Sequence, residues 1–460
     1  MNKNACKECK ELTTECSTKK KCEVVRKPLD AFSGIRFTAD GFDCALPVTI
    51  DSHSYCSFEC LYCFSDNLQG HIKKPTIKQT SLKQIENIFR GEGGKYGELV
   101  RTALRYEKRN EYGYPCAVQL GGLCDPCDTI ELNQGWLLNF MKLAIKYRQP
   151  VRMSTKGNLF QLKQYQDVIA EAPELFWIAF SIITNEDDII SKVDRYAPNT
   201  TERLKSMKIL HDLGCKTSLR LRPIIKGITD RNKNYIDLIN RCSDIGTNAI
   251  SYEVAFYPQR IPKEMKYKYK ELDNIIGYSF RKKYMSFGSI QACSRPSYMW
   301  TENIMHKIKE LAIVGGMTVG ISDPVWKQLS DSGCCCGIMP DDEVFGNWEV
   351  ENCTNTLIKA RDGKKDGLLY LKDIVPSWAY KMPLANMVNL GVGGHVKIKK
   401  KYFVWADKLK EIWNNPKMQR SPVNYFQGAV EPTGNFDVDG NLIYKFIGLK
   451  RNNKNYDWNI

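Results

Sequence analysis

The chain has 460 residues, of which 43% are hydrophobic, and its formal net charge is +15. This length allows one large domain with appendages or two to three domains, and the hydrophobic fraction excludes global disorder. The sequence has no apolar run near 18 residues and opens on polar residues, so we expect no signal peptide and no membrane association. Its 18 cysteines favour reduced thiols and metal sites in a cytoplasmic protein over a disulfide scaffold.

Residues 1–40 are rich in cysteine and lysine and show little apolar periodicity. The segment contains a compact set of four thiols: Cys6, Cys9, Cys16 and Cys22. Such a set could hold zinc or an additional iron–sulfur cluster. Only Cys6 and Cys9 have a knuckle-like spacing, so a tail with free thiols is the alternative.

Residues 41–325 alternate short apolar strands with amphipathic helices, and residues 326–460 form a C-terminal extension. We predict strands at Leu46–Asp51, Cys116–Gly121, Pro150–Thr155, Phe176–Ile182, Thr217–Arg222 and Ala249–Phe256, with a seventh at Met317–Ser322. Ser81 with Gln84, and Asn199 with Glu202, have the form of N-terminal caps ahead of two helices. Strands alternating with helices indicate an α/β fold with a parallel sheet, and six such units suit a (β/α) barrel, partial or complete.

A loop with three cysteines follows the first predicted strand. Cys56, Cys60 and Cys63 are separated by three and then two residues. Three thiolates so close together can bind three irons of a 4Fe-4S cluster, and the lack of a fourth nearby ligand leaves one iron open. The alternative is a set of buried, reduced cysteines, but this spacing is far more specific than a lone Cys-x-x-Cys.

Several predicted strands have a polar face. Side chains two apart on a strand share a face. The residues that point together are Arg152 with Ser154 and Lys156, Arg220 with Arg222, and Ser251 with Glu253. A barrel interior is ordinarily filled with branched apolar residues, so a cationic one is costly without an anionic ligand. An internal ion-pair network, for example Glu253 with one of the arginines, is the alternative.

The spacing of the three cysteines, with Tyr62 just before the last, resembles the signature of the radical S-adenosylmethionine (SAM) enzymes. Within that superfamily, later stretches resemble the spore photoproduct lyase and DNA repair photolyase group. In chain order these are Leu120–Glu131, Ser154–Asn158, Ser181–Asp187, Ala197–Leu204 and Arg222–Asp230. The resemblance implies a radical SAM partial (β/α)6 barrel and a 4Fe-4S cluster whose open iron binds SAM. One electron would then cleave SAM to a 5′-deoxyadenosyl radical.

The resemblance also implies roles for single residues. It places Tyr62 near the adenine, Gly121 and Gly122 beside the methionine amino group, Lys156 at the SAM carboxylate and Ser181 at the ribose. Arg220 or Arg222 would bind that carboxylate or a substrate phosphate, and Glu253 joins them as a cofactor-binding candidate. Ordinary packing or surface charge is the alternative for each.

One feature departs from the lyase pattern. Spore photoproduct lyase carries a cysteine just after its second strand that returns a hydrogen atom to the product radical. Here the sequence Gly122-Leu-Cys-Asp125 does not match that register. Cys124 or Cys127 could serve as the catalytic donor instead; if neither does, the reaction need not be dimer cleavage.

The C-terminal extension shows no resemblance that supports an assignment. Cys334, Cys335 and Cys336, with Cys293 or Cys353 in reach, suggest an auxiliary cluster or a redox-active thiol. Buried small hydrophobic residues are the alternative.

Two further stretches of the extension predict strands. His395–Trp405 alternates basic and aromatic side chains, as a strand that holds phosphates and stacks bases would, or as a sheet edge protected by lysines. Asn435–Phe446 predicts a hairpin that turns at Asp-Gly.

The positive charge favours a nucleic-acid partner, although excess lysine can also be solubilising surface. We expect a radical SAM enzyme that acts on nucleic acid, with DNA favoured and thymine-photoproduct reversal as the specific interpretation. An electron donor such as flavodoxin or ferredoxin would supply the reducing electron. The alternatives are radical modification of a nucleotide, tRNA or peptide, and a non-catalytic iron–sulfur protein that binds nucleic acid.

Overall fold

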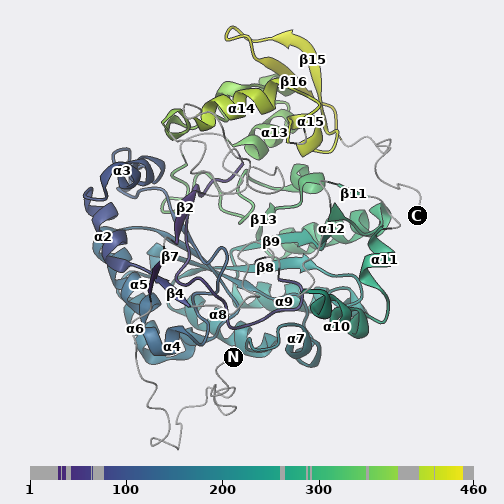
Figure 1. The fold of residues 1–460 in the computed structure, drawn as a ribbon. Helices are drawn as coiled ribbons and strands as arrows, with labels where there is room; N and C mark the ends of the chain where they lie inside the picture. The colour runs from purple at the N-terminus through teal and green to yellow at the C-terminus, as the bar shows by residue number, and fades with distance from the viewer. Residues whose placement is uncertain are drawn as a thin grey trace, which may run out of the picture.

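Figure 1 shows the fold in a computed structural model of the chain. The structure describes residues 30–32, 34–37, 43–63, 65, 77–258, 265–285, 289–290, 293–348, 352–381, 404–418 and 420–448. Cys6, Cys9, Cys16 and Cys22, the side chain of Cys293 and the stretch 395–403 lie outside what is described. The predictions made for them stay predictions.

The centre of the molecule is an eight-stranded sheet in the order β13-β9-β8-β7-β6-β5-β3-β2. Its strands are β2 Ile35–Phe37, β3 Val48–Ile50, β5 Val118–Leu120, β6 Val151–Thr155, β7 Phe176–Ser181, β8 Lys216–Ile224, β9 Ala249–Val254 and β13 Thr318–Ile321. Neighbours pair in parallel except β2, which runs antiparallel to β3. All seven predicted strands are confirmed. Within the described residues β13 and β2 are edge strands, so the sheet is open, as a partial barrel is.

Helices connect the strands and cover one face of the sheet; α8 packs on β7 and β8, and α12 packs on β9. The α-helices are α2 Leu82–Arg90, α3 Gly94–Ala103, α4 Glu131–Gln134, α5 Trp136–Tyr147, α6 Lys163–Ala170, α7 Asp187–Val193, α8 Thr200–Asp212, α9 Asn234–Ile245, α10 Lys266–Ile276, α11 Phe280–Met285 and α12 Tyr298–Val314. Short 3₁₀ helices lie at Leu159–Gln161, Pro173–Leu175, Arg231–Lys233 and Pro324–Leu329. In the described parts of the chain, no helix is long and apolar enough to cross a membrane.

Both predicted helix caps are confirmed. The Ser81 hydroxyl accepts a hydrogen bond from the Gln84 amide at 3.3 Å. The Asn199 side chain accepts one from the Glu202 amide at 2.9 Å. Each bond satisfies an amide that has no partner within its own helix, which explains why α2 and α8 begin at these residues.

The C-terminal extension packs on one side of the sheet, drawn in green to yellow in Figure 1. It contains α13 Cys353–Arg361, α14 Trp405–Asn414, α15 Pro422–Tyr425, the 3₁₀ helices Lys364–Gly367, Leu371–Asp373 and Ser377–Tyr380, and the strands β14 Leu368–Leu369, β15 Val430–Phe436 and β16 Leu442–Phe446. Strands β15 and β16 form the predicted hairpin, with Gly440 at φ 75° in its turn. Trp405 begins α14, which corrects the end of the strand predicted there, because Trp405 and Leu409 are buried on one face of that helix.

Two smaller sheets complete the fold. One pairs β1 Asp30–Phe32 with β4 Lys78–Thr80, and the other joins β10 Tyr257–Pro258, β12 Cys293–Ser294 and β11 Ser289–Ile290. A second buried cluster, separate from the main core, includes Leu61 of the cysteine loop together with Ile190 of α7 and Leu272 of α10. The cysteine loop is therefore anchored in apolar packing.

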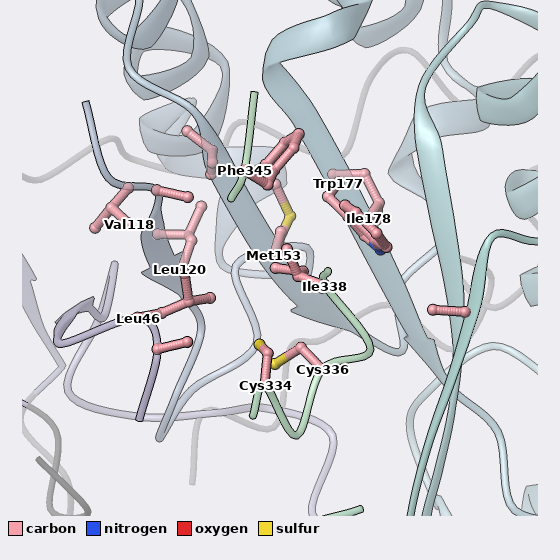
Figure 2. Close-up of a cluster of buried hydrophobic side chains, with 14 of the residues drawn as sticks. Leu46, Val118, Leu120, Met153, Trp177, Ile178, Cys334, Cys336, Ile338 and Phe345 are labelled. Atoms are coloured by element: carbon pink, nitrogen blue, oxygen red, sulfur yellow. The ribbon is translucent and has the colours of Figure 1, made fainter. Parts of the chain in front are cut away.

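The face of the sheet that the helices leave uncovered receives residues 334–345, which we call the inner segment. The Ser251 hydroxyl donates to the Cys335 carbonyl at 2.6 Å, and the Trp177 and Phe345 rings lie 5.4 Å apart. A Cβ on Gly320 would lie 2.4 Å from the Gly337 nitrogen, so this close approach requires glycine. Figure 2 shows Cys334, Cys336, Ile338 and Phe345 of the segment among buried side chains of the sheet strands.

Candidate functional site

The cysteine loop follows β3 at the edge of the sheet where the parallel strands end. Its backbone is held on two sides. The Leu61 amide donates to the Val193 carbonyl at 2.9 Å, and the Ser57 amide donates to the Asp128 carboxylate at 2.9 Å. The loop therefore has a defined shape between the end of α7 and the loop that follows β5.

The three thiols of this loop lie near one another. Cys60 is buried, whereas Cys56 and Cys63 are half-buried. Burial raises the pKa of Cys56 and of Cys60 well above the ordinary value, and Asp128 adds to this at Cys56 as Asp194 does at Cys60. Metal binding requires thiolates, so a bound cluster would have to supply the positive charge that stabilises them.

The iron–sulfur cluster predicted for these three thiols stays a prediction. Over the described ranges, no three His, Cys, Asp or Glu side chains meet closely enough to hold one metal ion. In a 4Fe-4S cluster each thiolate binds its own iron, so the three sulfurs need not converge on a point. Cys56, Cys60 and Cys63 would be the residues that hold it.

Lys156 lies beside these thiols, immediately after β6. Its amide donates to the Asp125 carboxylate at 2.6 Å, and its ammonium sits 5.5 Å from the centre of the Tyr62 ring. Burial favours the neutral amine, but Cys60 and Asp194 outweigh it and raise the pKa of Lys156. The predicted SAM residues Lys156 and Tyr62 are thus brought together next to the predicted cluster.

Asp194 completes this group and was not found from the sequence. It forms an ion pair with Arg203 at 2.8 Å, and both side chains are fully buried. Burial raises the pKa of Asp194, but Arg203 and Lys156 outweigh it and lower the pKa below its usual value. Arg203 belongs to a stretch that resembles the lyase group, whereas no local pattern marks Asp194 as its partner 9 residues earlier.

Gly121 and Gly122 lie in the loop after β5, and protein packing accounts for both. Gly121 has φ +77°, and a Cβ there would lie 2.7 Å from Pro126. A Cβ on Gly122 would lie 2.4 Å from the Arg36 guanidinium, and its amide donates to Asp51 at 2.8 Å. Their contact with the methionine amino group stays a prediction.

Cys124 and Cys127, the predicted hydrogen-atom donors, are both buried. The Cys124 sulfur lies 3.4 Å from the Ser52 hydroxyl, and the Cys127 sulfur lies 3.9 Å from the Met153 sulfur. Burial is the largest cause that raises the pKa of each thiol. A donor must touch its substrate, so the catalytic role of either thiol stays a prediction.

The polar face predicted for the strands is present and is the face that the inner segment covers. Arg222 donates to the Glu253 carboxylate at 2.8 Å, so the ion pair left open by the sequence is formed. Arg220 donates to the Ser181 hydroxyl at 3.3 Å. The structure therefore brings together Ser181, Arg220, Arg222 and Glu253, and the binding roles predicted for them stay predictions.

The cysteines of the extension separate into two places. Cys334, Cys335 and Cys336 lie in the inner segment, where the Cys335 sulfur is 3.9 Å from the Arg222 guanidinium. Figure 2 shows the side chains of Cys334 and Cys336 pointing toward one another. Cys353 begins α13, and burial together with nearby Asp43 raises its pKa well above the ordinary value. The auxiliary cluster stays a prediction.

Together, fold and site define an α/β protein with an open parallel sheet and a cysteine loop at the carboxyl edge of that sheet. No protein-family model and no curated protein sequence matches the chain. Solved structures of spore photoproduct lyase are similar to it, which is the group that the sequence motifs resemble.

The similarities to solved structures are low in identity. Spore photoproduct lyase with bound AdoMet and dinucleoside spore photoproduct has 12% identity and a TM-score of 0.44, over 64% of this chain and 79% of that chain. Spore photoproduct lyase complexed with dinucleoside spore photoproduct gives 13% and 0.46, over 62% and 79%. Streptococcus suis SuiB bound to S-adenosylmethionine gives 14% and 0.33, over 48% and 43%. TM-scores below 0.5 do not establish family or substrate.

Proposed function

We propose that the chain is a radical SAM enzyme. The observation that carries this proposal is that Lys156 lies beside the three-cysteine loop, over its Tyr62 ring, at one edge of the sheet. Ligands of open parallel sheets bind outside the carboxyl ends of the strands. The cysteine loop follows β3 and Lys156 follows β6, so both stand at that edge.

The residues of the site would have separate roles. Cys56, Cys60 and Cys63 would hold the cluster, which when bound supplies the electron that cleaves SAM to a 5′-deoxyadenosyl radical. Lys156 would bind the SAM carboxylate through a charge-assisted contact. Burial lowers the pKa of Lys156, but Cys60 and Asp194 outweigh it and favour the charged ammonium.

For the substrate we propose nucleic acid, with DNA favoured. The net charge of +15 supports a polyanionic partner, and the motif resemblance supports thymine-photoproduct reversal as the specific reaction. A flavodoxin or ferredoxin would donate the electron. Radical modification of a nucleotide, tRNA or peptide is the alternative within the same class, because one fold hosts many reactions.

Formation of 5′-deoxyadenosine tests the enzyme class. Anaerobically reconstituted protein, once reduced, should bind iron and convert SAM to 5′-deoxyadenosine. Cys56→Ala should lose this product, whereas Cys44→Ala, a matched loss of a half-buried thiol away from the loop, should keep it. Iron without 5′-deoxyadenosine would favour the non-catalytic iron–sulfur protein, and a cluster unaffected by Cys56→Ala would reject the site.

A further inference from the structure

The polar face of the sheet carries more positive than negative charge. Arg152 of β6 lies near Arg220 and Arg222 of β8. The charges of Arg222 and Arg152 lower the pKa of Arg220. Glu253 is bound to Arg222 at 2.8 Å. Asp323, whose pKa Glu253 helps to raise, forms its own ion pair with Arg295 at 2.5 Å.

Arg152 and Arg220 have neutral hydrogen-bond partners in the described part of the chain. Arg152 donates to the Gln119 side chain at 2.9 Å and to the Ser154 hydroxyl, and Arg220 donates to the Ser181 hydroxyl at 3.3 Å. Arg152 is 2% exposed, and its Nε and Nη2 atoms have no partner among the described residues. Buried positive charge without a counter-charge is costly.

Neighbouring groups do not remove this cost. Burial lowers the pKa of Arg220 to about 9, and Arg222 and Arg152 add to the effect, yet the side chain remains a cation at neutral pH. The Glu253 carboxylate also acts on Arg220, but its printed hydrogen bonds come from Arg222. The described residues therefore place one carboxylate, that of Glu253, beside the three arginines Arg152, Arg220 and Arg222.

We propose that Arg220 and Arg152 form an oxyanion site on the polar face, which takes a phosphate or carboxylate group. Arg220 is half-buried and would contact the ligand with its planar fork of donors, while Arg152 beneath supplies charge. Arg220 is paired in register with Ser181, the last residue of β7, so the site adjoins the edge where the cysteine loop lies. The reaction that the site would serve rests on the proposed function, whereas the binding of an anion does not.

Inorganic phosphate is the probe, and binding is measured by calorimetry at constant ionic strength on the full chain without reconstituted cluster. Arg220→Gln should weaken phosphate binding about tenfold or more, because a charge-assisted contact is lost. Arg90→Gln, which removes an exposed arginine from α2, should leave binding unchanged. No phosphate binding by the wild type, no loss in Arg220→Gln, or an equal loss in Arg90→Gln would overturn the proposal.

Thermal melting without phosphate separates this site from a structural role. Arg220→Gln should melt at or above the wild-type temperature, because the variant removes one of three neighbouring cations that share a single carboxylate. A much lower melting temperature would show that Arg220 is structural and would overturn the proposal. If Arg220→Gln does not fold, Arg220→Lys keeps the charge and should retain part of the phosphate affinity; full retention would count against recognition by the fork.

A SAM titration of reconstituted protein identifies the source of the anion. Unchanged SAM affinity in Arg220→Gln, together with weaker phosphate binding, assigns the site to a substrate phosphate. A parallel loss of both assigns it to the SAM carboxylate. Phosphate binding needs no cluster, so failure of SAM cleavage in the wild type would reject the proposed function without touching the oxyanion site.

Discussion

Lys156 and Arg220 are both half-buried cations at the carboxyl edge of the sheet, but their surroundings differ. Lys156 lies near Asp194 and the Cys60 thiol, which raise its pKa. Burial lowers the pKa of Arg220 to about 9, and the neighbouring Arg222 and Arg152 add to this effect. The first environment contains a buried carboxylate of its own, that of Asp194, whereas the second is the one for which we propose an anionic ligand. The difference separates a cation held ready by its own neighbours from one that a ligand would neutralise.

The ion pair behind Lys156 should show the largest effect. Arg203→Met leaves the Asp194 carboxylate buried without its partner, and we expect a loss of about 3–5 kcal/mol in the free energy of unfolding. Arg90→Met, on the exposed side of α2, should change it by less than about 0.5 kcal/mol. Urea unfolding measures both variants. A loss below about 1 kcal/mol in Arg203→Met would mean that Asp194 relies on Lys156 instead.

Glu131 is the acidic counterpart of Arg220, because it is fully buried and accepts hydrogen bonds from neutral groups, including Tyr165 at 2.9 Å. Burial raises its pKa to about 7. A raised carboxyl pKa means that the folded state holds a proton that the unfolded state releases, so stability falls as pH rises from about 4.3 to about 7.

Glu131→Gln should remove this pH dependence. Relative to the variant, wild-type protein should lose up to about 3 kcal/mol of unfolding free energy between pH 4.5 and pH 7.5, since each pKa unit is worth about 1.4 kcal/mol. Urea unfolding across this pH range measures the difference. Parallel curves for the two proteins would show that Glu131 is ionised in the fold at a normal pKa.

A substitution of Lys156 tests its predicted contact with the SAM carboxylate. Lys156→Met should leave the iron content unchanged but weaken SAM binding by about 1.5–3 kcal/mol, because a charge-assisted contact to the carboxylate is lost. Lys163→Met, at an exposed position of α6, is the matched control. A SAM titration of reconstituted protein gives both affinities, and equal values for Lys156→Met and wild type would remove Lys156 from the site.

Much of the fold was predictable from local patterns. The strands β6 to β9 are runs of five to nine residues with apolar side chains on at least one face, and the caps at Ser81 and Asn199 are formed as their spacing indicated. The alternation along β8 also placed Arg220 and Arg222 on one face correctly. These features depend on neighbours within a few residues, which is why the sequence reveals them.

The features that were missed depend on contacts between distant residues. The inner segment reaches the polar face from beyond β13, and Cys335 meets Ser251 across 84 positions of the chain. Lys156 follows β6 and Asp194 follows α7, and the fold brings the two side chains together. Strand β2 was missed because it lies within residues 1–40, where the sequence shows little apolar periodicity. No local spacing encodes such contacts.

The salt dependence of DNA binding should show the smallest effect, but it distinguishes Arg220 from Lys156 most sharply. Each contact between a cation and a phosphate adds roughly 0.9 to the slope of log affinity against log salt for duplex DNA. If Arg220 receives a substrate phosphate, Arg220→Gln should lower this slope by about that amount, whereas Lys156→Met, whose partners lie within the site, should not change it.

Neutralising Lys399, Lys400 and Lys401 together should lower the slope further if that segment follows the DNA backbone, while SAM cleavage without substrate stays intact. Should the wild type bind no duplex at low salt, the substrate would be a peptide or small molecule, and the anion at Arg220 would belong to that substrate or to SAM.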